Sequence, residues 1–184
     1  AWLLRQGAAG WPRIPRALRC VAGVLALWLT WLAVFQAKVI GSNFLLSMLV
    51  LVWMADIAAY FAGRAFGRRK LAPGISPGKS WEGVYGGMAG VLLLALGWMA
   101  ADQRWAVDAP SLYTRLLHLG WGGGLLGLLF LTLMSVVGDL VESLVKRSAG
   151  VKDSSHLLPG HGGVLDRVDA LLPTLPLAMM LALS

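Results

Sequence analysis

Acidic and basic side chains at helical spacing are the residues of this sequence best suited to chemistry. Asp139, Glu142, Ser143 and Lys146 fall at positions i, i+3, i+4 and i+7 of one apolar stretch, so one stripe of a helix carries all four. Ionisable groups are costly inside an apolar segment and by default mark a functional site. A structural ion pair among these groups is the alternative that the residues leave open.

Two further stretches repeat this spacing. Asp166 and Asp169 lie at i and i+3, and Asp56, Tyr60 and Gly63 lie at i, i+4 and i+7. Carboxylates that converge from different helices suit Mg²⁺, a hard cation that takes oxygen ligands and shares them with substrate phosphates. We therefore expect three helices to present polar stripes to one cavity that binds Mg²⁺.

A loop rich in glycine, serine and proline offers phosphate chemistry. Its segment Gly78-Lys79-Ser80 imitates the end of a P-loop, but Pro73 stands where that motif needs glycine, and we expect no strand before it. We reject the P-loop interpretation. A lysine in a turn that leads into a helix N-terminus can still bind phosphate, so Ser76, Lys79 and Ser80 are candidate substrate-binding residues.

A second loop, residues 146–163, is basic at its start and glycine-rich at its end. The basic residues are Lys146, Arg147 and Lys152. Gly162 and Gly163 favour close approach of the backbone to a ligand. The alternative is a solvated basic loop that touches lipid headgroups. His161 is a candidate base, phosphate donor or structural hydrogen-bonding group, and the structural role is the most common for a lone histidine.

The elements that must position these residues are membrane helices. The chain is 58% hydrophobic and 14% charged, against about 45–50% and about 25% in soluble proteins. Five segments reach the roughly 20 apolar residues that a span requires: Cys20–Ala37, Asn43–Gly67, Gly83–Ala101, Gly122–Val145 and Val164–Leu183. We predict an all-α polytopic transmembrane helix bundle that forms a single domain, residues 1–184. Gly86-x-x-x-Gly90 and Gly123-x-x-x-Gly127 predict close helix packing only.

Basic residues set the expected orientation. The formal net charge is +7, and the positive charge gathers before the first span and in the loops 67–82 and 146–163, whereas the connection 102–121 is balanced. By the positive-inside rule these two loops are cytoplasmic. The excess indicates anionic membrane lipids as partners, not nucleic acid. We expect an integral multi-pass protein of a bacterial cytoplasmic membrane, with its active site on the cytoplasmic side.

Residues 143–147 (SLVKR), 152–154 (KDS) and 158–169 (LPGHGGVLDRVD) form a long patterned stretch. Together with residues 56–83, they resemble the CDP-diacylglycerol synthase (phosphatidate cytidylyltransferase) family. The similarity extends from about Val52 to Leu172. Members of that family have further N-terminal spans, so the resemblance implies that this chain is the C-terminal part of a longer one.

The resemblance implies conversion of CTP and phosphatidic acid to CDP-diacylglycerol and pyrophosphate, with Mg²⁺ and a possible K⁺ as cofactors and a homodimer as one candidate assembly. It assigns metal binding to Asp139 and Asp166, with Glu142, Asp169 and Asp56 as additional candidates. The implied catalytic residues are Asp139, Asp166, Lys146, Arg147 and Lys152. The implied substrate-binding residues are Lys79, Ser80, Ser76, Arg64, Ser143, His161, Gly162, Gly163 and Arg167.

Three other functions compete with this interpretation. A transporter also lines its path with polar stripes, but the outer halves of these spans are almost wholly apolar, which favours a one-sided site. Another membrane lipid phosphotransferase is separated from the cytidylyl reaction only by the family resemblance. An inactive membrane subunit is the third alternative.

Overall fold

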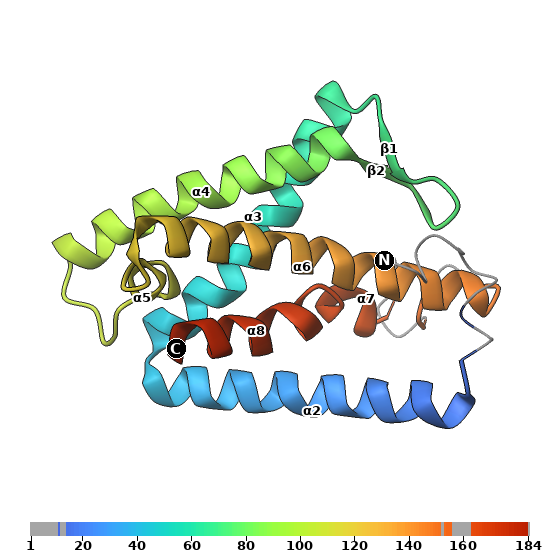
Figure 1. Ribbon diagram of the computed structural model, residues 1–184, viewed down its shortest axis with the longest axis horizontal. Helices are drawn as coiled ribbons and strands as arrows, with labels where there is room; N and C mark the ends of the chain where they lie inside the picture. Colours follow the sequence, from blue (N-terminus) through green and yellow to red (C-terminus); the bar gives the residue numbers. More distant parts are fainter. Residues whose placement is uncertain (1–10, 12–13, 152, 156–162, 184) are drawn as a thin grey trace.

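The computed structural model describes residues 11, 14–151, 153–155 and 163–183. In chain order its elements are α2 (Arg16–Ile40), α3 (Ser42–Phe66), β1 (Lys70–Ala72), β2 (Ser76–Ser80), α4 (Trp81–Arg104), α5 (Leu112–Leu117), α6 (Gly120–Ser148), α7 (Leu165–Val168) and α8 (Leu171–Leu183). Figure 1 shows a bundle of long helices with the β-hairpin at one end and the short α5 at the other. We call these the hairpin end and the α5 end.

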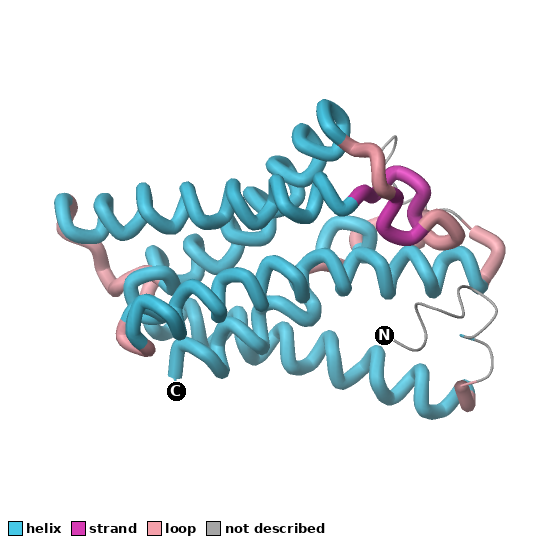
Figure 2. The backbone as a smooth tube through the Cα atoms, turned by 45° about the horizontal axis from the view of Figure 1, so that its top comes forward, coloured by secondary structure: helices cyan, strands magenta, loops and turns pink. Residues whose placement is uncertain are grey.

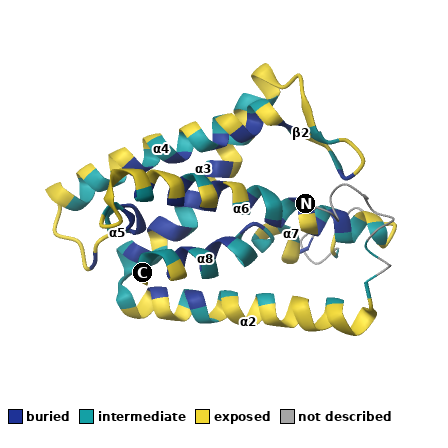
Figure 3. Cartoon of the chain, in the orientation of Figure 1, coloured by how far each residue is buried: buried dark blue, intermediate teal, exposed yellow. Residues whose placement is uncertain are grey.

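Helices dominate the structure, as predicted. Within the described residues, α2, α3, α4 and α6 are long and apolar enough to cross a membrane, and they coincide with the first four predicted spans. The fifth predicted segment is divided between α7 and α8, and α8 has 13 residues in Leu171–Leu183. Buried residues follow the faces where helices meet, and α2 turns most of its apolar surface outward (Figure 3).

A two-stranded hairpin adds a small β element to the predicted helical bundle, and its strand β1 contradicts the expectation that no strand precedes Gly78-Lys79-Ser80. Strands β1 and β2 pair antiparallel, with Lys70 opposite Ser80 and Ala72 opposite Ser76 (Figure 2). The chain reverses between them at Pro73 and Gly74, which are residues that favour turns. What the sequence indicated as an irregular loop is thus a short paired hairpin that leads directly into α4.

Helices α3 and α4 pack closely because small residues face each other. A Cβ atom at Gly86 would overlap the Cβ of Ala62, and one at Gly90 would lie 2.5 Å from the Cβ of Ala58. The predicted packing role of Gly86-x-x-x-Gly90 is therefore confirmed. At Gly127 a Cβ would meet only ordinary van der Waals contacts, and at Gly123 it would lie 2.9 Å from Cβ of Leu119, the residue just before α6, so this pair does not bring two long helices together in the same way.

Proline leaves a carbonyl to be satisfied at the α2–α8 contact. Pro176 lies inside α8 and has no N–H to donate to the carbonyl of Leu172, four residues earlier. The hydroxyl of Thr30 in α2 lies 3.0 Å from that carbonyl oxygen and 2.7 Å from its own helix's Ala26 oxygen. An apolar environment makes an unsatisfied carbonyl costly, so Thr30 stabilises the contact between α2 and α8.

The carboxylates of Asp102 and Asp108 accept several hydrogen bonds at the α5 end. Asp108 accepts hydrogen bonds from the N–H groups of the first two residues of α3, which hold the pKa of its carboxyl below the usual value. Asp102 accepts from Ser111 N (2.9 Å), from Thr114 Oγ1 (2.6 Å) and from the amide of Asn43 (2.9 Å). Both carboxylates therefore act as helix and loop caps, and this end of the bundle is closed by a hydrogen-bonded network.

Candidate functional site

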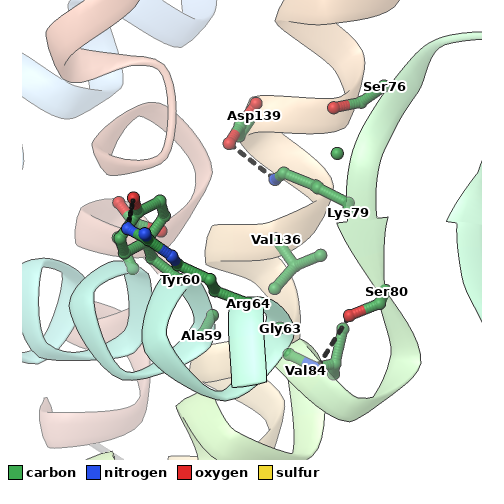
Figure 4. A pocket seen from close by; sticks show the side chains of 13 residues that line it. Ala59, Tyr60, Gly63, Arg64, Ser76, Lys79, Ser80, Val84, Val136 and Asp139 are labelled. Atoms are coloured by element: carbon green, nitrogen blue, oxygen red, sulfur yellow. Dashed lines mark hydrogen bonds and ion pairs between the residues drawn. The ribbon is translucent and has the colours of Figure 1, made fainter. Parts of the chain in front are cut away.

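A cavity of about 480 Å³ opens between α3, the hairpin, α4 and α6. Figure 4 shows side chains from these elements around it. The cavity brings together six residues that the sequence proposed for the site: Asp56, Arg64, Ser76, Lys79, Ser80 and Asp139. Residues more than 80 positions apart in the chain thus meet in one cavity.

The ion pair between Lys79 and Asp139 is the central contact of this cavity. The Lys79 ammonium lies 2.5 Å from Asp139 Oδ2, and the two side chains are only 24% and 32% exposed. Ser143 Oγ donates to the other oxygen of Asp139 at 3.3 Å. The predicted stripe on α6 therefore faces the hairpin, and a half-buried cation sits where a phosphate could exchange with the carboxylate.

Glu82 holds the hairpin that presents Lys79, and sequence reasoning gave it no role. Its carboxylate accepts from the backbone N–H groups of Arg68 and Arg69 at 3.2–3.3 Å, and Trp81 N donates to Arg69 O at 2.9 Å. The available signal was an acidic residue in the first turn of a helix that begins after Ser80. These bonds fasten both ends of the hairpin to each other.

A second cluster of charges lies further along α6. The Lys146 ammonium is 2.5 Å from Glu142 Oε2 and 2.6 Å from Asp166 Oδ1, so one cation bridges two carboxylates from different helices. Glu142 is 7% exposed, and among the described residues its Oε1 atom has no hydrogen-bond partner. A buried carboxylate oxygen with free lone pairs is unusual and is a candidate ligand atom.

Asp166 closes the base of the glycine-rich loop. Its Oδ2 atom accepts from Ser154 N (3.0 Å), Ser154 Oγ (2.9 Å) and Gly163 N (2.7 Å). It therefore ties together the two described ends of the segment between α6 and α7. Ser154 stands in the KDS block of the sequence, but spacing alone did not show that its donors serve Asp166.

The remaining predicted residues lie at the rim or outside the described part. Arg64 Nη1 lies 3.2 Å from the hydroxyl of Tyr60, and both side chains are exposed at the edge of the cavity. Arg147 and Arg167 are exposed and do not line the cavity. Three predicted residues lie outside the described residues: Lys152, His161 and Gly162.

The charge balance of the two clusters suits a divalent cation. Asp169 interacts electrostatically with Asp139, Lys79 and Lys146, which connects the clusters, and Asp56 interacts with Asp139 and Asp169. Together with the pair bridged by Lys146, five carboxylates face two ammonium groups. Within the described residues, no three carboxylate, histidine or cysteine side chains are grouped at metal-binding distance. The carboxylate oxygens are nevertheless donors of the type that Mg²⁺ takes.

The fold and site define a helical membrane protein with a charged cavity suited to phosphate-bearing ligands. A sequence profile described as "Cytidylyltransferase family" matches residues 3–184. The chain belongs to the cytidylyltransferase family, and the resemblance seen in the sequence is confirmed.

Several curated relatives carry the name phosphatidate cytidylyltransferase. The Pseudomonas aeruginosa protein is 46% identical over 156 residues, which are 84% of this chain and 53% of that protein. The Haemophilus influenzae protein is 48% identical over 136 residues, 74% and 44% of the two chains. The Brucella suis protein is 45% identical over 167 residues, 91% and 55% of the two chains. The chain spans about half the length of these relatives.

A solved structure described as an intramembrane enzyme for archaeal membrane lipid biosynthesis is also similar. It shares 21% sequence identity with a TM-score of 0.46, over 73% of this chain and 77% of that one. At these values the likeness supports no argument about the site.

Proposed function

We propose that this protein transfers a cytidylyl group from CTP to phosphatidic acid, with CDP-diacylglycerol and pyrophosphate as products. The observation that carries the proposal is the half-buried Lys79–Asp139 pair in a cavity that collects six of the predicted residues. The family of the chain and the names of its relatives support the same reaction.

The lysines would bind the phosphates of the nucleotide. Lys79 and Lys146 are held in place by carboxylates, so each ammonium group is positioned before a phosphate binds and would exchange a carboxylate for it. Ser76 and Ser80 line the same side of the cavity and add hydroxyl groups. Arg64 lies at the exposed edge of α3 beside Tyr60, where a lipid phosphate can reach it from the bilayer.

Asp139 and Asp166 would hold Mg²⁺, with Oε1 of Glu142 as an additional donor. When bound, the ion supplies positive charge that offsets the charge of the triphosphate and of the leaving pyrophosphate. Lys146 keeps Glu142 and Asp166 close to each other, and the bonds from Ser154 and Gly163 fix the orientation of Asp166. The protein thus contributes positioning more than covalent chemistry.

The reaction forms one phosphorus–oxygen bond and breaks another. An oxygen of the phosphatidic acid phosphate attacks the α-phosphorus of CTP, and the bond from that phosphorus to the bridging oxygen of the β-phosphate breaks. The pyrophosphate leaves with the electron pair. No general base is required, because a phosphate monoester has a second pKa near about 6 and is largely ionised at neutral pH.

We also propose a multi-pass arrangement with the hairpin end in the cytoplasm, where CTP is made. Four long apolar helices and basic residues around the hairpin support it. The transporter alternative requires a path to both faces. The network around Asp102 and Asp108 at the α5 end argues against such a path, because these carboxylates are occupied by helix and loop N–H groups.

Pyrophosphate release by the purified protein in detergent tests the proposed reaction. We expect release to require phosphatidic acid together with CTP, and to be much weaker with ATP, GTP or UTP. Asp139→Asn should lower the rate about 10–100-fold or more, because loss of a ligand or its support has effects of that size. Release that is equal with all four nucleotides would contradict the proposal.

Two lysines of the same hairpin give a matched pair for this assay. Lys79→Ala removes the cation beside Asp139, and Lys70→Ala removes an exposed cation of β1 that does not line the cavity. We expect Lys79→Ala to lose at least about tenfold in activity and Lys70→Ala to retain it. Equal rates in the two variants would show that Lys79 is only a solvated basic residue.

A further inference from the structure

A second cavity lies at the α5 end, far from the charged site. It has a volume of about 360 Å³ and lies between the segment that contains α5 and the C-terminal end of α8. Figure 1 shows these two segments together at the end of the bundle opposite the hairpin. Its lining residues are Pro110, Arg115, His118, Leu119, Leu181 and Ala182.

Arg115 is a cation without a counter-ion in the described part of the chain. Its guanidinium stacks over the ring of Phe44, 5.0 Å from the centroid, and its Nε atom is buried without a hydrogen-bond acceptor. None of the ion pairs among the described residues involves it. The nearby carboxylates of Asp102 and Asp108 serve backbone N–H groups instead.

The ring contact fixes the position of this cation, so the guanidinium is presented ready for an anion. His118 follows Arg115 by three residues and lines the same cavity, which adds a second group able to donate a hydrogen bond. The other walls are aliphatic. A guanidinium and an imidazole beside aliphatic walls suit a phosphate that carries an apolar tail.

The position of the cavity fits the headgroup layer of a bilayer. Helix α2 ends at Ile40, α4 ends at Arg104 and α6 begins at Gly120, so the ends of three long helices lie at the level of α5. Leu119 of the lining is exposed, as are Trp121 and Leu183, which are close in sequence to lining residues, and all three supply apolar surface for acyl chains.

We propose that Arg115 and His118 bind the phosphate of an anionic phospholipid headgroup in the leaflet at the α5 end. This lipid site is distinct from the charged cavity at the hairpin end and takes no part in the proposed cytidylyl transfer. A lipid bound there would contact both α5 and α8 and stabilise the α5 end of the bundle. The ligand is a phosphate with a net negative charge, which the unpaired charge of Arg115 selects over a zwitterionic headgroup, and the aliphatic walls select a lipid over free phosphate.

Thermal unfolding of the purified full chain in detergent tests the site. Added phosphatidylglycerol should raise the melting temperature by about 5 °C at saturation, whereas phosphatidylcholine and inorganic phosphate should have little effect. Arg115→Ala should weaken phosphatidylglycerol binding about tenfold. Arg104→Ala removes a charge at the same end from a residue that does not line the cavity, and it should bind the lipid as the wild type does.

Ala182→Phe provides a variant that keeps Arg115 and its contact with Phe44. The larger side chain fills the cavity without a change of charge, so it should also abolish the stabilisation by phosphatidylglycerol. Equal lipid responses in the wild type, Arg115→Ala and Ala182→Phe would overturn the proposal. Stabilisation by inorganic phosphate as large as that by the lipid would also overturn it, since the site would then bind the free anion.

Discussion

Gly138 offers the sharpest test of how the fold positions the charged site. It precedes Asp139 in α6 and faces the turn between α7 and α8. A Cβ atom at Gly138 would lie 2.7 Å from the carbonyl oxygen of Asp169 and 2.8 Å from Cγ of Pro173. One of these atoms is backbone and the other belongs to a rigid ring, so neither can rotate away.

The size of the effect follows from this contact. In Gly138→Ala the two segments must separate by at least a few tenths of an ångström, since Cβ contacts below 3.0 Å essentially do not occur. Overpacking of this kind costs about 1–3 kcal/mol, which corresponds to a melting temperature lower by about 2–12 °C for a chain of this length. The shift also moves Asp169 relative to Asp139, and misplacement of reacting groups by about 1 Å can cost 10²-fold in rate.

Gly97 in α4 is the matched control, because nothing lies within 4 Å of a Cβ placed there. Gly97→Ala gains helix propensity of up to about 1 kcal/mol and should leave stability unchanged or raised, with normal activity. Thermal unfolding in detergent and pyrophosphate release measure both effects. If Gly138→Ala matches Gly97→Ala in both assays, the close contact between α6 and the α7–α8 turn does not position the site.

Three further predictions concern other parts of the bundle. Thr30→Val should lower the free energy of unfolding by about 1 kcal/mol, measured by thermal unfolding, because the Leu172 carbonyl loses its donor. Thr30→Ser keeps a hydroxyl and should retain most of the stability. A valine variant as stable as the wild type would contradict this role of the hydroxyl. Since the pKa of Asp108 is lowered in the folded protein, its stabilisation is complete above the ordinary value of about 4 and is lost as the pH falls below it. Asp108→Asn should therefore flatten the melting-temperature curve below about pH 4, and parallel curves in that range would refute this. Gly78 and Trp105 are both exposed, and each can be replaced by cysteine in a chain that lacks Cys20. An impermeant thiol reagent should label the cysteine at position 78 only from the cytoplasm and the cysteine at position 105 only from outside. Labelling of position 78 from outside would contradict the proposed orientation.

The helices could be predicted from the sequence because their signal is local. Long apolar segments bounded by charged loops have few other stable conformations in a membrane, and four of the predicted spans coincide with helices. The polar stripe from Asp139 to Lys146 followed from helical periodicity in the same way. The close α3–α4 contact followed from the spacing of Gly86 and Gly90, since small residues are what such contacts require.

The hydrogen-bond and ion-pair partners of the site residues could not be predicted. These contacts depend on the path that the short segments between the helices take. Lys79 reaches Asp139 only because the hairpin is fastened by Glu82 to the backbone of Arg68 and Arg69. Periodicity carries no information about such bonds. The same holds for Asp166, whose bonds to the loop backbone depend on where the chain returns after α6.

The lysine contacts also bear on the proposed reaction, in which the site would bind a polyanion together with Mg²⁺. Lys79 and Lys146 each neutralise carboxylates in the structure, so a phosphate that binds either lysine leaves a carboxylate of α6 without its counter-ion. In a cavity partly shielded from water such a charge is strongly unfavourable. In the proposed reaction a phosphate would take the lysine and a cation at Asp139 would replace it at the carboxylate, so each would favour binding of the other. The arrangement of lysines and carboxylates thus favours joint binding of anion and cation over binding of the anion alone.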